Sequence, residues 1–179
     1  FDEISDTENP QGILALCKFP NERDLEEFSF QKGIILATDA IQDPGNMGTI
    51  IRTAAWFGAK AILAGKGSVD VFHPKVVRST AGATGSIPII SGDLAELLQE
   101  MQKESWEILL LDGGSNSENL AHIQPSKKTI LVVGNEANGI EEKLLNKYKT
   151  VKIEGDSKSV ESLNAAVAVS IALWAIESS

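Results

Sequence analysis

The first segment of chemical interest lies at the start of an expected helix and carries polar residues among glycines. It runs from Asp43 to Ala54 and contains Asn46, Gly48 and Arg52. We expect Asn46 to cap the helix, whose first N–H groups and dipole favour an anion. The helical spacing points Arg52 away from the apolar stripe. A lone arginine is typically a solvated surface residue, but its place beside Asn46 and two glycines favours a functional role.

A second polar segment follows a strongly apolar run. Leu131–Val133 leads directly into a loop that contains Gly134, Glu136 and Gly139. Glycine lets the backbone approach a ligand closely, and parallel sheets bind ligands at the carboxyl ends of their strands. An ordinary strand-to-helix turn has a similar composition, so this segment by itself is only moderately specific.

The third segment lies near the C-terminus. Ile153 ends an expected strand, and Ser162, Leu163 and Asn164 stand before a long stretch rich in alanine and valine. Serine and asparagine at such a position are commonly helix caps. A functional role is nevertheless favoured, because the segment follows the other two at a plausible spacing.

The elements that must position these segments alternate along the chain. Helical spacing predicts helices near residues 46–55, 94–101, 140–145 and 162–177, and Asp93 is an expected N-cap. Continuous apolar runs are typical of strands buried on both faces of a parallel sheet. The expected strands are Ile13–Cys17, Ile34–Thr38, Ala61–Ala64, Ile87–Ile90, Ile108–Leu111, Thr129–Val133 and Thr150–Ile153. The alternation predicts an α/β fold with a mostly parallel sheet flanked by helices.

Length and composition exclude several classes of protein. The 179 residues, 42% of them hydrophobic, suit one globular domain. A single cysteine, Cys17, excludes an internal disulfide, and with two distant histidines it predicts no metal site. The longest apolar run, Ala165–Ile176, is shorter than the roughly 20 residues that cross a bilayer. We therefore expect a cytoplasmic protein without a membrane partner.

The common nucleotide and hydrolase motifs are missing. The sequence has no P-loop, and Gly65-Lys66-Gly67 is followed by Asp70 where the dinucleotide fingerprint needs a third glycine. It also has no nucleophile elbow of the Gly-x-Ser-x-Gly type. Dehydrogenase and hydrolase functions therefore lose support.

Together the three polar segments resemble the motifs of the SpoU/TrmH methyltransferases, which belong to the SPOUT superfamily. The matching patterns are Asn46-x-Gly48-x-x-x-Arg52-x-Ala54, Gly134-x-Glu136-x-x-Gly139 and Ser162-Leu163-Asn164. The resemblance covers roughly Gly33–Glu177. Phe1–Lys18 is similar to the junction after an RNA-binding N-terminal domain. We therefore expect residues 1–32 to be a junction with a first strand, following a missing RNA-binding domain, and residues 33–179 to be the methyltransferase domain.

The resemblance implies a fold, a cofactor and an assembly that the residue pattern alone does not show. The C-terminal part of the α/β domain would form a trefoil knot. S-adenosylmethionine would bind against the knot, held by backbone groups at Gly134, Ile153 and Leu163. The protein would act as a homodimer with the terminal helix in the interface. Ile153 is followed by Glu154-Gly155, where the family commonly has Pro-Met, so the pocket wall is altered.

The implied reaction is methyl transfer to a ribose 2′-hydroxyl in structured RNA, with ribosomal RNA favoured over transfer RNA. Arg52 would grip a phosphate and stabilise charge on the 2′ oxygen, because a guanidinium is a costly base at neutral pH. Asn46 would orient Arg52 or the ribose, and Glu136 would fix the loop or hold Arg52. Ser162 and Asn164 would form hydrogen bonds to the substrate or the cofactor near the dimer interface.

Two alternatives remain beside ribose methylation. One is a base-methylating enzyme from another SPOUT branch, although the Ser162-Leu163-Asn164 signature favours ribose. The other is a catalytically inert RNA-binding knot module. The joint retention of Asn46, Arg52, Glu136 and Asn164 argues against that second alternative.

The net charge of −9 speaks against a protein that is basic over its whole surface. The charge is uneven, however, because Gly33–Gly92 carries five basic and three acidic residues while both flanks are acidic. We expect Lys66, Lys75 and Arg78 of this middle stretch to face RNA. The acidic remainder predicts that the chain binds RNA weakly without its missing domain.

Overall fold

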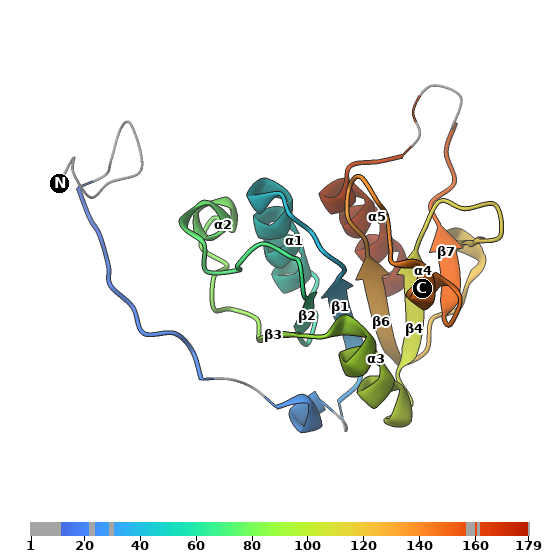
Figure 1. Cartoon of the computed structure of the whole chain (residues 1–179), viewed down its shortest axis with the longest axis horizontal. Coiled ribbons are helices and arrows are strands. Elements are labelled where there is room, and N and C mark those ends of the chain that lie inside the picture. Colours follow the sequence, from blue (N-terminus) through green and yellow to red (C-terminus); the bar gives the residue numbers. More distant parts are fainter. Residues whose placement is uncertain (1–11, 22–23, 29–30, 157–159, 161, 179) are drawn as a thin grey trace.

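A single parallel sheet organises the molecule. The computed structural model describes residues 12–21, 24–28, 31–156, 160 and 162–178. Seven strands lie in the order β3-β2-β1-β6-β4-β7-β5, and all their pairings are parallel (Figure 1). They are β1 (Gly33–Thr38), β2 (Ile62–Gly65), β3 (Ile89–Gly92), β4 (Glu107–Leu111), β5 (Glu118–Asn119), β6 (Lys128–Val133) and β7 (Lys149–Lys152). The predicted parallel α/β fold is confirmed.

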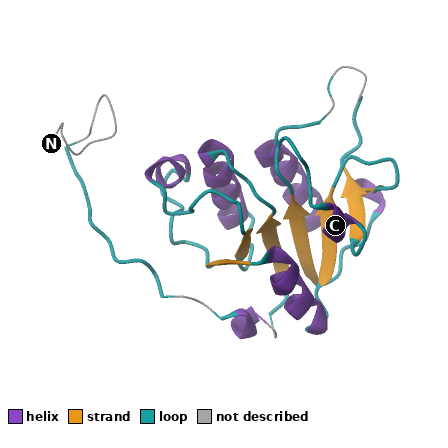
Figure 2. Ribbon diagram, viewed as in Figure 1, coloured by secondary structure: helices purple, strands orange, loops and turns teal. Residues whose placement is uncertain are grey.

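Helices cover both faces of the sheet. Two of them, α1 (Pro44–Trp56) and α5 (Ala165–Glu177), pack against each other behind the sheet in Figure 1. On the opposite face lie α3 (Leu94–Lys103) and the short α4 (Glu142–Leu145), as the ribbon in Figure 2 also shows. The remaining elements are α2 (Pro74–Ser79), η1 (Leu25–Phe28) and η2 (Leu120–His122).

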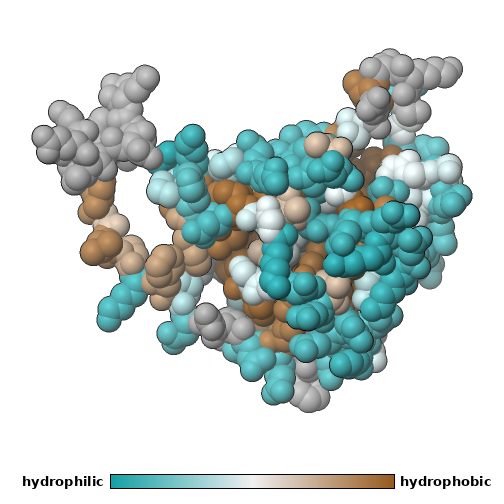
Figure 3. Space-filling model, in the orientation of Figure 1, coloured by the Kyte–Doolittle hydropathy of each residue, from teal (hydrophilic) through white to brown (hydrophobic). Residues whose placement is uncertain are grey.

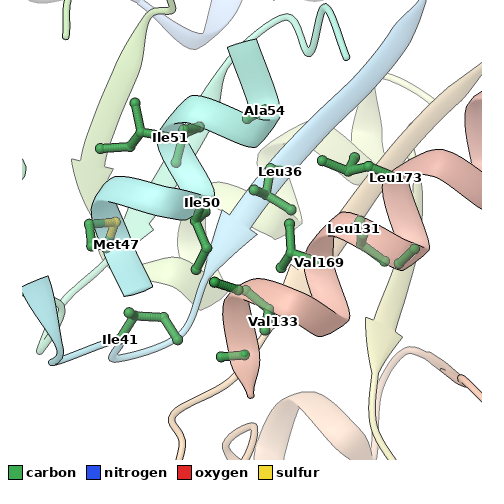
Figure 4. Packing of buried hydrophobic residues seen from close by; sticks show 14 of the residues in the cluster. Leu36, Ile41, Met47, Ile50, Ile51, Ala54, Leu131, Val133, Val169 and Leu173 are labelled. Carbon is green, nitrogen blue, oxygen red and sulfur yellow. The ribbon is translucent and has the colours of Figure 1, made fainter. Parts of the chain in front are cut away.

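The central strand β1 shows why its sequence is apolar without alternation. Ile34 and Leu36 point into the core under α1 and α5, where Figure 4 shows Leu36 near Val169. Ile35 and Ala37 point into the second core, under α3 and α4. Both sets are buried, so a strand between two helical layers needs apolar residues at every position.

The expected strand at Ile13–Cys17 is wrong. Residues 12–21 form no regular element, and Ile13 and Leu16 are 86% and 98% exposed. The segment appears in Figure 3 as a string of apolar residues beside the main body. Within the described part of the chain, the segment makes one aromatic contact, an edge-to-face contact between Phe19 and Phe72 with ring centroids 5.0 Å apart. An apolar run becomes a strand only where another strand offers backbone partners, and no described strand pairs with this one.

Two classes of feature, a membrane-spanning helix and a metal-binding cluster, are absent from the described residues. Among the described residues, no helix has the length and apolar character that crossing a membrane requires. The same part of the chain contains no group of three or more histidine, cysteine, aspartate or glutamate residues placed to hold a metal ion.

Candidate functional site

The carboxyl ends of three neighbouring strands form a cavity of about 880 Å³. Leu111 of β4 pairs with Val133 of β6 on one side and with Val151 of β7 on the other. The segments that follow these strands therefore lie side by side, as expected for a ligand site in a parallel sheet. The N-terminal part of α5 and the residues before it complete the wall. Six predicted site residues line this cavity: Gly134, Glu136, Ile153, Ser162, Leu163 and Asn164.

A chain of hydrogen bonds joins all three polar segments at this cavity. Asn164 Nδ2 donates to Asn46 Oδ1 at 2.9 Å, and Asn46 Nδ2 donates to Glu136 Oε1 at 2.6 Å. Asn164 Oδ1 accepts from the backbone N–H groups of Ala166 and Val167, so Asn164 is the N-cap of α5. Hydrogen bonds thus fix both the nitrogen and the oxygen of each side-chain amide, and the series of bonds ends on the carboxylate of Glu136.

The expected N-cap role of Asn46 is wrong. Asp43 caps α1, because its Oδ1 accepts from the backbone N–H of Asn46 at 2.7 Å. Pro44 occupies the first helical position, where its missing N–H costs nothing. Capping by Asp43 leaves the Asn46 side chain available for Glu136 and Asn164.

The loop after β6 is compact and needs its glycines. Asn135 and Gly139 exchange two backbone hydrogen bonds of 2.9 Å, which closes the loop on itself. A Cβ on Gly134 would lie 2.3 Å from the carbonyl carbon of Gly139. Gly139 adopts φ +69°, a conformation that side chains disfavour. Asn135 Nδ2 also donates to the backbone oxygen of Ala40, which ties the loop to the end of β1. The backbone at Gly134 is thereby held at the cavity wall.

Arg52 is not among the residues that line the cavity. It is exposed on α1, and within the described residues its guanidinium forms no ion pair. Its neighbour Thr53 faces α5, where the hydroxyls of Thr53 and Ser170 lie 3.4 Å apart. Successive helical residues differ by about 100°, so Arg52 projects away from that contact, as the spacing predicts.

The three predicted RNA-facing cations occupy two places. Lys75 and Arg78 line a second cavity of about 470 Å³ at the N-terminus of α1, together with Asp43, Pro44, Gly45 and Ser79. Lys66 instead follows β2, and its Nζ lies 3.8 Å from a carboxylate oxygen of Asp93. Asp93 caps α3, and the backbone N–H of Glu96, followed by the positive charge of Lys66, lowers the pKa of its carboxyl.

The sequence interpretation gave no role to three acidic residues that line the larger cavity, Asp112, Glu154 and Asp156, although it placed Glu154 in an altered pocket wall. Asp112 directly follows β4, and its Oδ2 accepts from the backbone N–H of Gly114 at 2.9 Å. Glu154 follows β7, and its Oε2 accepts from Asn119 Nδ2 at 2.8 Å. Their positions just after predicted strands are the signal that could have identified them.

Comparison with known proteins identifies the family. The SpoU rRNA Methylase family matches residues 33–174. The chain belongs to this family. The SpoU-family chain is 35% identical, over 180 aligned positions, to the 23S rRNA (guanosine(2553)-2′-O)-methyltransferase RlmP of Bacillus subtilis. That alignment covers 97% of this chain and 68% of the relative. An uncharacterized tRNA/rRNA methyltransferase of Synechocystis is 30% identical, and the alignment covers 62% of its length.

Solved structures of SpoU-family relatives have the same fold. An AdoMet-bound rRNA methyltransferase from Sinorhizobium meliloti superimposes with a TM-score of 0.82 at 28% identity, covering 88% of this chain and 61% of that one. The SpoU methyltransferase AviRb from Streptomyces viridochromogenes, in complex with AdoMet, gives 0.78 at 25% identity and covers 88% and 65%. The resemblance to SpoU/TrmH methyltransferases is therefore confirmed.

Proposed function

We propose that this chain transfers a methyl group from S-adenosylmethionine to a ribose 2′-hydroxyl of ribosomal RNA. The predicted methyltransferase activity and cofactor are confirmed by the family match and by AdoMet-bound relatives. The proposal depends above all on the hydrogen bonds that link Asn164, Asn46 and Glu136. These bonds bring the three family motifs together beside one cavity. The predicted cytoplasmic location belongs to the same proposal.

The larger cavity suits the cofactor in size and chemistry. Its volume lies within the range of about 300–1,000 Å³ that is usual for small-molecule sites. Leu111, Val133 and Ile153 supply apolar wall, and carboxylates supply partners for a cationic ligand. The backbone at Gly134, Ile153 and Leu163 would hold the cofactor, which supplies a methyl group already activated by a sulfonium.

The chain's own polar residues would align the RNA. The guanidinium of Arg52 stays charged at neutral pH, so it would grip a phosphate and stabilise negative charge on the 2′ oxygen and not act as a base. Asn46 would orient the ribose, and Glu136 would hold Asn46 in place. Ser162 and Asn164 stand at the cavity, where they can meet the substrate or the cofactor.

A homodimer is part of the same proposal. Val167, Ile171 and Trp174 form an exposed apolar stripe on α5, at the spacing of one helical face. Trp174 is 62% exposed, and Trp56, at the end of the adjacent helix α1, is 85% exposed. Ile171 also lines the cavity, so a second copy on this stripe would close the cavity's open side.

The dimer can be tested by light scattering coupled to size-exclusion chromatography. Val167→Asp places a charge in the stripe and should convert the dimer to a monomer, whereas Glu100→Ala on the exposed side of α3 should not. A monomeric unaltered protein would contradict the proposed dimer.

The trefoil knot and the division into a junction (1–32) and a methyltransferase domain (33–179) remain predictions that belong to this proposal. Residues 1–11 of the junction lie outside the described residues. An RNA-binding unit before this junction also stays a prediction, and the chain covers 68% and 62% of the length of the two matched relatives.

The function is tested by mapping 2′-O-methyl sites in total RNA from cells with and without the gene. We expect one ribosomal site to disappear without the gene and to return with the unaltered gene, but not with Arg52→Ala. Loss of a transfer-RNA site would correct the substrate, and loss of a methylated base would favour the base-methylating alternative. An unchanged RNA methylation pattern would favour an inert RNA-binding module.

A further inference from the structure

The wall of the larger cavity has an excess of negative charge. Among the described residues that line it, four carry carboxylates and one carries an ammonium: Asp112, Glu136, Glu154 and Asp156 against Lys152. The carboxylates follow the ends of all three strands that form the cavity, so negative charge lies on several sides of it.

Three of these carboxylates are held by neutral donors. Glu136 accepts from the Asn46 amide at 2.6 Å, and Glu154 accepts from the Asn119 amide at 2.8 Å. Asp112 accepts from the backbone N–H of Gly114. A neutral donor fixes the direction of a carboxylate without cancelling its charge, whereas a lysine or arginine partner would cancel it. The negative potential therefore remains available to a ligand.

We propose that Asp112, Glu136 and Glu154 make this cavity prefer the charged sulfonium cofactor over the neutral thioether product, so that methyl transfer itself promotes product release. The inference rests on the proposed function, because it takes this cavity as the cofactor site. The apolar wall at Leu111 and Val133 lowers the local dielectric and strengthens the effect of each charge.

The charge change follows from the balance of the reaction. The bond between the ribose 2′ oxygen and the methyl carbon forms, while the bond between sulfur and that carbon breaks. The electron pair of the broken bond stays on sulfur, which changes from a cationic sulfonium to a neutral thioether. The proton of the 2′-hydroxyl leaves to solvent. One positive charge in the cavity is lost, and with it the attraction of the surrounding carboxylates.

Isothermal titration calorimetry with three ligands tests this inference. The ligands are S-adenosylmethionine, S-adenosylhomocysteine and sinefungin, which carries a protonated amine in place of the sulfonium. The unaltered protein should bind both charged ligands about 3- to 10-fold more tightly than the neutral product, and added salt should reduce the difference. Glu154→Gln and, separately, Asp112→Asn should weaken binding of the charged ligands and leave the product's affinity within about twofold.

Glu100→Gln is the matched control, because it removes one negative charge from the exposed side of α3. It should leave all three affinities unchanged, and melting curves should show that every variant is folded. Equal affinities for charged and neutral ligands, or equal weakening of both in the variants, would overturn the inference while leaving the cofactor site intact. Failure of the unaltered protein to bind any of the three ligands would overturn the proposed cofactor site as well.

Discussion

Asn46 Nδ2 donates a 2.6 Å hydrogen bond to Glu136 Oε1, although the two residues lie 90 positions apart in the sequence. The same asparagine accepts from Asn164, so one side chain links the start of α1, the loop after β6 and the cap of α5. Because Asp43 already caps α1, this link is the only described side-chain role of Asn46. The Asn46 side chain therefore positions the loops that form the cavity.

Replacing Asn46 with alanine should lower the rate of methyl transfer about 10- to 100-fold, because Glu136 and Asn164 lose the amide that aligns them. The free energy of unfolding should fall by about 1–3 kcal/mol, because two hydrogen bonds are lost and each is usually worth about 0.5–1.5 kcal/mol net. Single-turnover kinetics on a ribosomal-RNA transcript and thermal melting provide the two measurements. Asn138→Ala is the control, because Asn138 lies in the loop that carries Glu136 but does not line the cavity. Equal rates for the two variants would show that Asn46 does not position the residues of the site.

Arg52→Ala should reduce turnover at least about 100-fold, since a charged donor to the phosphate and the 2′ oxygen is lost. Its affinity for S-adenosylmethionine should stay within about twofold, because Arg52 does not line the cavity. Arg52→Lys should recover only part of the rate, because lysine lacks the forked donors of arginine. Near-normal turnover of Arg52→Ala, with cofactor affinity unchanged, would show that the central catalytic assignment is wrong.

Two glycines in the cavity wall offer a matched pair of substitutions. Gly134→Ala should abolish measurable cofactor binding, because its Cβ would lie 2.3 Å from Gly139 and force the loop open. Gly113→Ala should bind normally, because nothing lies within 4 Å of the added carbon. Calorimetry with S-adenosylmethionine compares them directly. Equal affinities would mean that the backbone at Gly134 does not form the binding surface.

The basic residues of the second cavity, at the N-terminus of α1, should account for part of the salt dependence of RNA binding. Alanine at both Lys75 and Arg78 should weaken RNA binding and reduce the slope of log K against log salt by about 1 per lost phosphate contact. Lys66→Ala should have a smaller effect, because Lys66 follows β2 and does not line that cavity. Filter binding over a range of salt concentrations measures all three slopes. An unchanged slope in the double variant would place the RNA on another face.

Asp93→Ala should lower the melting temperature at neutral pH, because Asp93 caps α3 and interacts with Lys66. The pKa of Asp93 is lowered in the folded protein, mainly by the backbone N–H of Glu96. Its contribution is therefore complete above the ordinary aspartate pKa and disappears as the pH falls through the lowered value. Melting curves of both proteins between neutral and acidic pH should converge at the acidic end. A gap that stays constant with pH would contradict a role for the ionised carboxylate.

The sequence patterns predict local features well where the cause is local. Asp93 caps α3 as expected, and apolar spacing places α1 and α5 within a few residues of their observed bounds. The strand at Ile13–Cys17 was wrong because strand formation depends on a partner, which composition does not reveal. The gathering of acidic residues around one cavity was not predicted for a related reason. Asp112 and Glu154 line the same cavity only because β4 and β7 are neighbours, and strand order is not visible in one sequence.

The bond between Asn164 and Asn46 spans 118 residues and has a consequence during synthesis. A chain leaves the ribosome from its N-terminus, so β1 and α1 emerge long before the cap of α5 exists. Contacts of such long sequence separation form late, after much loop-closure entropy has been lost. A prematurely terminated chain would contain α1 and its Arg52 but would lack the part of the cavity wall that α5 forms. Methyl transfer therefore becomes possible only when almost the whole chain has been made, so an incomplete product cannot modify RNA.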